Sequence, residues 1–403
     1  MIPKFVRAKF AGVQQPLGRW ILRHVVEFIA LSPAILVTWL WLKIRHKEVL
    51  IVGVASSSIT AFLMPLEVEL RRRVEIKSVL SQLIVLDLSP DANSQIRKMY
   101  DRVVKIYGEE AKLPRRIIWW ASALGQLQLP KKEILKTQED PMWHIGQPLM
   151  SLTAEEIEVG NKFLESMGIG KNQPIVCYAT RSSSYYEKLS ASGVQLKPRN
   201  VRNPDESIYF EVAKYLSEQG MFVIRMGRDL DTKVPDSYKK YILDYASEFR
   251  TDFLDVFLLH QCIFLINGST GIGLMRAVFN LPTIYSDFYR NHNNFFKGDL
   301  ALFQKVLFVD KNRLATAGEM VSMKDQYSDE RHQERLGVRL VKNTVEEILA
   351  ACDEMTARLD GTWATTEEDE TLQKKYWDLI CESDHHGGRI GAQFLRDNQD
   401  LLR

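Results

Sequence analysis

Short apolar runs alternate with helical patterns in the first half of the chain. The run Glu48–Val54 is almost continuously apolar, and a turn of small residues and a helical pattern through Leu70 follow it. The run Leu83–Leu88 repeats this arrangement, and the spacing of residues 94–106 predicts another helix. Strands that lack polar alternation and lead into helices are typical of parallel sheets covered on both faces. The pattern therefore predicts an α/β fold.

A second series of elements begins at Thr153. Residues Thr153–Glu156 match a capping box, which predicts a helix that ends near Gly168. From Thr344 onward the pattern is helical and charged, with no further strand expected. Between these points we expect helices over 204–219, 254–260 and 271–279, and strands over Pro174–Ala179, Phe222–Met226, Cys262–Ile266 and Pro282–Tyr285. Strands alternating with helices of ordinary length predict a doubly wound parallel sheet.

This pattern divides the chain into four segments. The polar stretch from Lys131 to Ser151, which contains Pro141 and Pro148, predicts a linker between two domains. The expected segments are a basic membrane-associating segment (1–47), an N-terminal Rossmann-like domain with the linker (48–150), a C-terminal Rossmann-like domain (151–345) and a helical C-terminal tail (346–403).

The N-terminal segment contains an uncharged run, residues 28–42, with basic residues on both sides. The run is shorter than the roughly 20 residues that a spanning helix needs, and Pro33 interrupts it. No small-residue cleavage site follows it, so a removable signal peptide is not expected. Trp39 and Trp41 suit a headgroup boundary, and the flanking basic residues suit anionic lipid. We predict a monotopic or re-entrant anchor on the cytoplasmic face of the inner membrane. The alternative is a buried helix that pads the first domain.

Composition excludes some classes of function. The net charge of +2 is too small for the basic field of a nucleic-acid-binding protein. The four cysteines are far apart and form no CxxC pair. Cys177 and Cys262 lie in apolar runs and are expected to be reduced core thiols, which favours a reducing compartment.

Polar residues follow three of the strands expected in the second domain. Arg181 follows the first strand, Gly227 and Arg228 follow the second, and Gly268–Gly271 follows the third. Carboxyl ends of parallel strands meet at one edge, where arginines and a helix N-terminus favour an anion. Arg225 lies within a strand, where its charge requires a partner or a ligand. In the alternative interpretation the Gly268–Gly271 turn is only structural and the arginines pair with Asp244, Asp252 or Asp255.

Other candidate motifs are weaker. Asp229-Leu-Asp231 imitates a metal-binding DxD, and His385-His386 has no supporting ligand cluster in the sequence. No Gly-x-Ser-x-Gly elbow or His-Glu-x-x-His motif is present, so common hydrolase mechanisms have no basis here. We expect neither a metal site nor a cofactor.

The sequence resembles a family of bacterial glycosyltransferases encoded with surface-polysaccharide genes and, more distantly, the donor domain of GT-B fucosyltransferases. The resemblance covers Thr153 to about Asp310, and extends more faintly to the first domain and to Arg389–Leu395. Four motifs carry it: Ala179-Thr-Arg181, Arg199-Asn200-Val-Arg202, Val223-Ile-Arg-Met-Gly-Arg228, and the block from Asp252 to Ser269. Where fucosyltransferases have an arginine pair and then Gly-Asp, this sequence has Thr180-Arg181-Ser182, so the donor base and sugar stay open.

The resemblance implies a GT-B fold, with two Rossmann-like domains facing a cleft and a nucleotide-sugar held mainly by the C-terminal one. It also implies that Arg181 stabilises the departing diphosphate. A metal-independent transferase of hexosyl or deoxyhexosyl type is expected, acting on a glycan acceptor that a membrane anchor suggests is lipid-linked. The base is expected from the first domain, where Asp87 and the Ser56–Ser58 turn are candidates. The expected donor-binding residues are Arg225, Gly227, Arg228, Gly268, Ser269, Thr270, Gly271, Asp252, Asp255 and Tyr245.

Two other functions fit the same scaffold. A nucleotide-sugar epimerase or hydrolase would have no need of a lipid anchor. A non-catalytic nucleotide- or glycan-binding protein would have each of the three arginines paired to a carboxylate.

Overall fold

The computed structural model divides the chain into two compact units. Unit 1 comprises residues 1–137 and 186–197, and unit 2 comprises residues 138–185 and 198–403. The structure describes residues 17–44, 50–54, 56–75, 83–87, 91–125, 142–145, 147–182, 184, 203–268, 270–288, 296–323, 327, 330–380 and 387–403.

Unit 1 contains a three-stranded parallel sheet in the order β1-β2-β3. Its elements are α2 (Leu17–Ile44), β1 (Leu50–Val54), α3 (Ile59–Glu75), β2 (Leu83–Asp87), α4 (Ser94–Asp101), β3 (Ile106–Tyr107), the 3-10 turn η3 (Glu109–Ala111) and α5 (Lys112–Gly125). The two strands predicted here are confirmed. The helix predicted over 94–106 is too long, because α4 ends at Asp101 and Ile106 already pairs with Val85 of β2.

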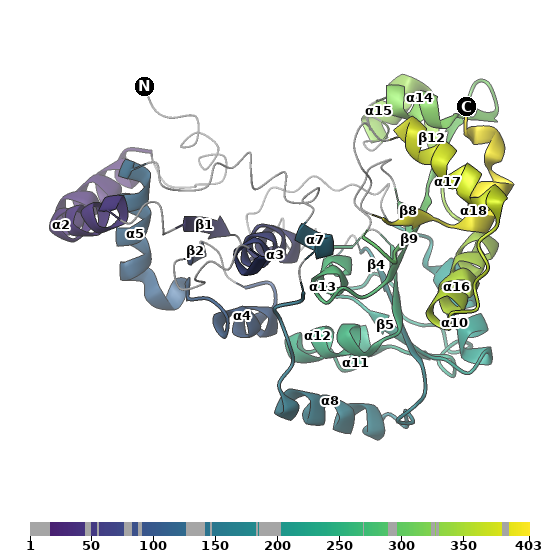
Figure 1. Ribbon diagram of the computed structural model, residues 1–403, viewed down its shortest axis with the longest axis horizontal. Coiled ribbons are helices and arrows are strands. Elements are labelled where there is room, and N and C mark those ends of the chain that lie inside the picture. Colours follow the sequence, from purple (N-terminus) through teal and green to yellow (C-terminus); the bar gives the residue numbers. More distant parts are fainter. Residues whose placement is uncertain are drawn as a thin grey trace. The chain divides into compact units, whose positions relative to one another are not determined.

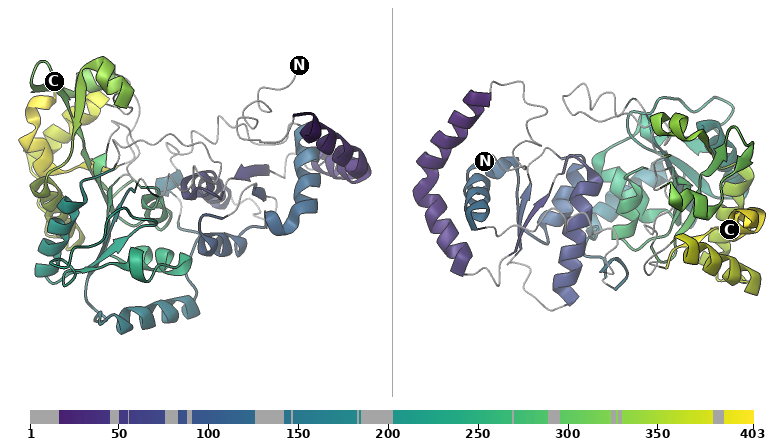
Figure 2. Two further views of the ribbon diagram at one scale, coloured as in Figure 1. Left: turned by 180° about the vertical axis from the view of Figure 1, so that it is seen from behind. Right: turned by 90° about the horizontal axis from the view of Figure 1, so that it is seen from above.

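Helix α2 corrects the expectation that Pro33 interrupts the N-terminal apolar segment. The helix runs for 28 residues through Pro33. It packs along α5, and the two helices lie side by side (Figures 1 and 2). Among the described residues it is the one helix long and apolar enough to cross a membrane, and 11% of its window His24–Ile44 is buried. One face of the helix therefore pads unit 1, as in the alternative interpretation, while its outward face is exposed.

Unit 2 is built on a seven-stranded sheet in the order β13-β9-β8-β7-β4-β5-β6, in which every pairing is parallel. Its strands are β4 (Ile175–Thr180), β5 (Phe222–Met226), β6 (Ile242–Leu243), β7 (Phe264–Gly268), β8 (Thr283–Phe288), β9 (Leu300–Phe303) and β13 (Arg389–Ile390). The chain runs outward from β4 to β5 and β6 and then returns to the other side of β4 as β7. The predicted doubly wound parallel sheet is confirmed.

Helices cover both faces of this sheet (Figure 1). One face carries α8 (Ala154–Ser166), α11 (Tyr245–Glu248), α12 (Asp252–Gln261) and α13 (Gly273–Val278), and the other carries α10 (Glu206–Glu218), α16 (Val345–Leu359), α17 (Glu367–Ile380) and α18 (Ala392–Asp397). The capping box predicted at Thr153 is confirmed, and it opens α8. Gly168 and Gly220 follow α8 and α10 with φ of 76° and 87°, which favours glycine at these helix ends.

We expected the C-terminal region to be helical, but it also contains strands. Strand β13 pairs with β9 and extends the sheet. The Gln373 side chain accepts from Ile390 N at 3.1 Å and donates to Ile390 O at 2.5 Å, so it continues the hydrogen-bonding pattern beside β13. A small antiparallel sheet, β11-β10-β12, is also present. The remaining elements are α7 (Met142–Ile145), β10 (Lys305–Phe308), β11 (Arg313–Leu314), α14 (Ala317–Ser322), α15 (Glu330–Leu336), β12 (Val338–Val341) and η7 (Gln399–Leu401).

The expected α/β class is confirmed in both units, whereas the doubly wound strand order is present in unit 2 and not in the three described strands of unit 1. The chain is α/β with parallel sheets, the layer type of GT-B proteins, and it has an apolar helix near its N-terminus. Cys177, Cys262 and Cys352 are buried free thiols, as expected for the first two. Cys262 ends helix α12 rather than lying in a strand.

Candidate functional site

The crossover point of the large sheet lies between β4 and β7. Thr180 at the end of β4 is in register with Gly268 at the end of β7. From β4 the chain continues to β5 on one side of this point, and from β7 it continues to β8 on the other side. In open α/β sheets, ligands bind beyond the carboxyl ends of the strands at such a switch point. Two of the three loops singled out from the sequence therefore flank the position where a ligand is expected.

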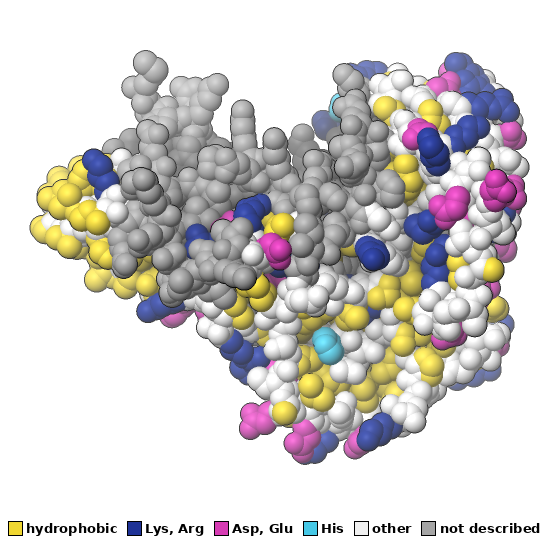
Figure 3. Space-filling view, in the orientation of Figure 1, with side chains coloured by type: hydrophobic (Ala, Val, Ile, Leu, Met, Phe, Trp, Pro, Cys, Tyr) yellow, Lys and Arg dark blue, Asp and Glu magenta, His cyan; other side chains and the backbone are white. Residues whose placement is uncertain are grey.

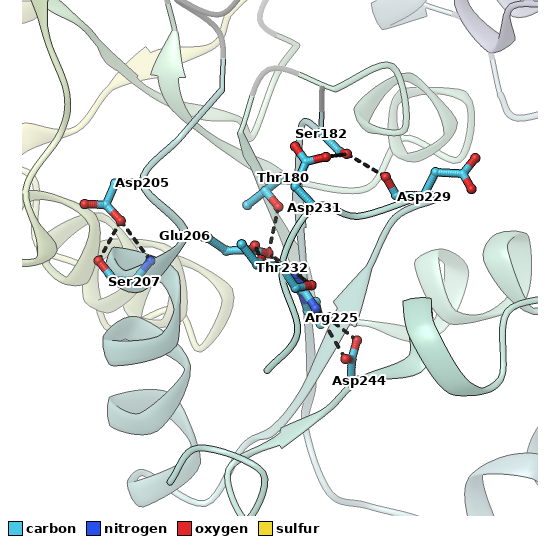
Figure 4. A network of polar contacts seen from close by, with 10 residues as sticks. All are labelled: Thr180, Ser182, Asp205, Glu206, Ser207, Arg225, Asp229, Asp231, Thr232 and Asp244. Atoms are coloured by element: carbon cyan, nitrogen blue, oxygen red, sulfur yellow. Dashed lines mark hydrogen bonds and ion pairs between the residues drawn. The ribbon is translucent and has the colours of Figure 1, made fainter. Parts of the chain in front are cut away.

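The loop after β4 is held against the loop after β5 (Figure 4). The Ser182 hydroxyl lies 2.5 Å from the Asp229 carbonyl and 2.9 Å from Asp231 Oδ1, which also accepts from Ser184 N at 2.8 Å. Arg181, between Thr180 and Ser182, is 9% exposed. The Asp229 carbonyl and the Asp231 carboxylate therefore support this loop.

Arg225 is a structural residue and not a ligand residue, which corrects the sequence-based assignment. Its guanidinium donates to Glu206 Oε1 from Nε and Nη2 at 2.8 and 2.6 Å, and Nη1 faces both Asp244 oxygens at 3.3 Å (Figure 4). Nη2 also bonds to Thr232. The side chain is 0% exposed. Since these internal acceptors use all three nitrogens, Arg225 has no donor left for a diphosphate.

Glu206 is the centre of this network, and the sequence analysis missed it. Besides Arg225, it accepts the hydroxyls of Thr180 and Thr232, so it joins the end of β4 to the loop after β5. Burial raises the pKa of the Glu206 carboxyl, while Arg225 acts in the opposite direction. The signal in the sequence was an acidic residue directly after Asp205, the residue that caps α10.

The loop after β5 begins with an unusual backbone. Gly227 has φ of 143° and Asp229 has φ of 52°. The φ of Gly227 favours glycine, and a Cβ there would also push against Leu230 Cδ2, 2.8 Å away. The Arg228 side chain is 51% exposed, and its Nε lies 3.7 Å from Asp229 Oδ2. Arg228 therefore extends into solvent at the edge of the sheet, in contrast to Arg225.

The turn after β7 is organised by Asn267, a second residue that the sequence analysis missed. Its Oδ1 accepts from the amide and the hydroxyl of Thr270 at 3.2 and 2.6 Å, and its Nδ2 donates to the Thr270 carbonyl at 3.2 Å. A Cβ on Gly268 would lie 3.0 Å from the Tyr209 hydroxyl oxygen, and one on Gly273 would lie 2.4 Å from Asn267 Nδ2. A side chain at Gly273 would therefore displace Asn267, and one at Gly268 would crowd Tyr209. The Asn was visible in the sequence at the end of an apolar strand.

The helix after this turn is shorter than predicted. Helix α13 covers Gly273–Val278, and its N-cap, Ile272, has no side-chain cap. The amide of Ile272 lies 3.4 Å from the Thr270 hydroxyl oxygen, a long contact. Ser269, which the sequence analysis assigned to the donor phosphate, lies outside the described residues, as do the Arg199–Arg202 motif and His385-His386.

The candidates near α12 form a cluster of their own. Asp255 accepts from the Tyr245 hydroxyl at 2.9 Å and from Arg250 Nη2 at 2.6 Å, and Asp252 lies 3.2 Å from the same nitrogen. Tyr245 is 0% exposed. Burial raises the pKa of Asp255 to about 6. Because these groups bond to one another, Tyr245 and Asp255 support the start of α12, and their part in donor binding stays a prediction.

Asp87 in unit 1 is not placed to act as a base, which corrects a further assignment. Its side chain is fully buried, with Oδ2 3.0 Å from Arg97 Nη1 and Oδ1 accepting from Ser56 N at 3.2 Å. Its carbonyl accepts from Arg115 Nη1 at 2.7 Å. A general base must reach the proton that it removes. Asp87 instead ties the Ser56 turn, α4 and α5 to the end of β2.

Among the described residues, no group of three or more His, Cys, Asp or Glu side chains could hold a metal ion.

Comparisons with known proteins give structural likenesses only. No protein-family model matches the chain, and no curated protein matches it in sequence. Similar solved structures include glycosyltransferases and a putative UDP-N-acetylglucosamine 2-epimerase of Listeria monocytogenes, which is 9% identical at a TM-score of 0.24 and is covered over 77% of this chain and 97% of that one. ADP-heptose lipopolysaccharide heptosyltransferase II of E. coli is 12% identical at a TM-score of 0.42, covering 63% of this chain and 90% of that one. A family 9 glycosyltransferase of Veillonella parvula is 9% identical at a TM-score of 0.41, covering 76% and 97%.

Proposed function

We propose that the protein is a glycosyltransferase that binds a nucleotide-sugar at the carboxyl edge of the unit 2 sheet. The observation that carries the proposal is the register of Thr180 with Gly268 at the switch point, flanked by the Arg181 loop and the Gly268–Gly271 turn. The transferred group is a hexose or deoxyhexose. The acceptor is a lipid-linked glycan of cell-surface polysaccharide biosynthesis, and the protein acts at the cytoplasmic face of the inner membrane as a peripheral, monotopic protein.

The chemistry of sugar transfer fits the residues at this edge. The leaving nucleotide diphosphate gains negative charge while the sugar becomes oxocarbenium-like. In the proposed site Arg181 stabilises that charge, Arg228 adds a second positive charge, and Gly227, Gly268 and Gly271 allow the backbone to approach the phosphates. Thr270 and Ser269 supply hydroxyls. No metal ion is required in this mechanism, because guanidinium groups and backbone amides supply the compensation.

A thermal-shift panel tests the donor class. The purified chain is heated with UDP-, GDP-, CDP- and dTDP-sugars, each with and without EDTA. Stabilisation by one nucleotide class is expected and should not depend on EDTA, since a ligand that binds only the native state raises its apparent stability. If none of the sugars shifts the transition, the proposed donor site is wrong.

Arg181→Ala then tests the mechanism. A fall in kcat of roughly 10²–10³-fold is expected, the usual loss on removing one group that stabilises the developing anion. A cooperative unfolding transition must be retained for the result to count. Arg228→Ala should raise the KM for the donor, and Arg313→Ala, a comparably exposed arginine in β11, should not. Retained turnover in Arg181→Ala would remove this residue from the mechanism.

Product analysis separates the competing functions. A transferase consumes the donor only with an acceptor, whereas a hydrolase or epimerase converts it without one. A binding protein would give the thermal shift and no turnover.

A further inference from the structure

The outward face of helix α2 is apolar along its length. Nine residues form a stripe, defined here as Leu22, Val25, Val26, Ile29, Pro33, Leu36, Val37, Leu40 and Ile44. Their spacing of three and four residues places them on one side of the helix. Leu22, Ile29 and Val37 are 63%, 63% and 67% exposed. Figure 3 shows this surface as the yellow patch at the left edge. The stripe runs for about 33 Å at 1.5 Å per residue.

The opposite face of α2 is covered by unit 1. Phe28, Leu31, Ile35, Trp39 and Leu42 pack in one cluster with the apolar residues of α5. Phe28 lies edge-on to Trp120, with ring centroids 5.1 Å apart. A helix that is apolar on both faces while only one face is packed leaves the other face to be covered by something apolar.

Charge indicates which partner covers the stripe. The 28 residues of α2 include Arg19, Arg23, Lys43 and one acidic residue, Glu27. The Glu27 carboxylate is 13% exposed and is paired with Arg116 of α5 at 3.2 Å, so it is neutralised on the protein side. Lys43 lies 4.9 Å from the Trp39 ring centroid, at the edge of the stripe. An apolar stripe on a helix whose sequence carries more basic than acidic residues is complementary to an anionic lipid surface.

A hydrogen bond within the exposed face points to the same partner. Pro33 has no amide hydrogen, so the carbonyl of Ile29 loses its helical donor. The Ser32 hydroxyl donates to this carbonyl at 2.8 Å. In water, solvent would satisfy the carbonyl, but hydrocarbon offers no donor. Ser32 therefore supplies a donor to the Ile29 carbonyl, which Pro33 leaves without one on a face where no water would be present.

The attachment of α2 to unit 1 determines its orientation in the lipid. Arg116 pairs with α2, while the neighbouring Arg115 bonds to the Asp87 carbonyl at the end of β2. A helix crossing the bilayer would carry α5 and these arginines into the hydrocarbon, at a cost of several kcal/mol for each charge. A helix lying along the surface immerses the stripe and keeps α5 outside.

We propose that the stripe on α2 is a lipid-docking surface that lies parallel to the plane of an anionic membrane leaflet. The Ser32 hydroxyl satisfies the Ile29 carbonyl that Pro33 leaves without a helical donor. The inference deepens the proposed membrane association and is independent of the sugar donor, because it rests on residues of unit 1 alone.

The test measures how deeply individual positions of α2 lie in the lipid. An environment-sensitive fluorophore is attached to Cys introduced at Leu22, Ile29, Leu36 or Ile44, with Cys381 replaced by Ser, since the other three cysteines are buried. Vesicles of phosphatidylcholine with phosphatidylglycerol should blue-shift all four labels. Lipids brominated at one chain depth should quench all four to a similar extent. Val159 on α8 of unit 2, 57% exposed, is the matched control and should not respond.

Other outcomes contradict the proposal. Strong quenching by deep bromines at Ile29 and Leu36 with little at Leu22 and Ile44 would indicate a crossing helix. A shift that needs no vesicles and grows with protein concentration would indicate that a second copy of the chain covers the stripe. No response at any position would leave no lipid role for α2, while a positive thermal shift with a nucleotide-sugar would still support the proposed function.

Ser32 is tested by partitioning onto the same vesicles. Ser32→Ala should bind about fivefold more weakly, the size of one lost hydrogen bond, and Ser32→Thr should bind like the wild type. Ser166→Ala is the control, because Ser166 donates to the Phe163 carbonyl at 2.7 Å in the water-facing helix α8. Equal binding of Ser32→Ala and wild type would overturn this role of Ser32.

Discussion

Nη2 of Arg225 lies 2.6 Å from Oε1 of Glu206, and this ion pair joins strand β5 to the first residue of helix α10. Asp244 at the end of β6 approaches the same guanidinium at 3.3 Å. Two carboxylates thus share one fully buried arginine directly beneath the loops of the candidate site. The ion pairs therefore support the loops of the candidate site from within the protein.

Arg225→Ala is expected to lower the free energy of unfolding by about 3–5 kcal/mol, because Glu206 and Asp244 would be left as buried charges without a counter-ion. Arg228→Ala, on a side chain that is 51% exposed, should change it by no more than about 0.5 kcal/mol. Urea unfolding of both variants checks this. Equal, small effects would mean that Arg225 does not hold the network together.

Asn267→Ala should weaken donor binding through the turn that Asn267 shapes. The substitution removes its bonds to the amide, hydroxyl and carbonyl of Thr270. We expect about a tenfold higher KM for the nucleotide-sugar, the effect of one or two lost hydrogen bonds, with a smaller change in kcat. Steady-state kinetics at varied donor concentration measure this. An unchanged KM would separate the turn from the donor site.

Gly160→Ala should destabilise unit 2. The added Cβ would lie 2.2 Å from Cε2 of Phe257, a fully buried ring of α12. Overpacking of this kind costs about 1–3 kcal/mol, whereas alanine in an open helical position would stabilise by up to about 1 kcal/mol. Denaturant unfolding shows whether the substitution raises or lowers the free energy of unfolding. Gly170→Ala, whose Cβ would meet no atom closer than 3.9 Å, is the control, and Phe257→Leu should partly relieve the clash.

Asp299 should make stability fall as the pH rises toward neutrality. Burial raises the pKa of this carboxyl to about 7, although the amides of Phe296 and Thr283 and the charge of Arg276 act to lower it. Between about pH 4 and pH 7 the folded state keeps a proton that the unfolded state has released. This group therefore removes up to about 1.4 kcal/mol of stability per pH unit over that window and nothing further above it.

Unfolding of wild type and Asp299→Asn at several pH values tests this dependence. The stability of the wild type relative to the variant should decline from pH 5 to pH 7 and then level off. A difference that grows with pH would mean that the folded-state pKa of Asp299 is lowered.

Local patterns predicted the strands of the candidate site well. The runs around β4 and β5 are apolar on both faces because the sheet is covered by helices on both sides, and such runs are visible without knowledge of the fold. Strands β3, β6 and β13 have two residues each, too few for any periodicity, so they were not predicted.

Helix α2 shows where local reasoning failed. Pro33 was expected to interrupt the apolar run because it lacks an amide hydrogen and clashes with the preceding turn. The helix continues through it, with one face packed on α5 and the Ile29 carbonyl bonded to Ser32.

The amino-acid sequence by itself determined the α/β class, the positions of the main strands along the chain, and the presence of arginines and glycines at their carboxyl ends. These follow from hydrophobic period and turn chemistry, which are local properties. Only the tertiary structure decided which arginine is buried in an ion-pair network and which one is exposed. Arg225 and Arg228 are three residues apart, yet one is fully buried between Glu206 and Asp244 and the other extends into solvent. Each of those two carboxylates is 19 residues from Arg225, and only the crossing of the chain through β4, β5 and β6 brings opposite charges together in a place that excludes water.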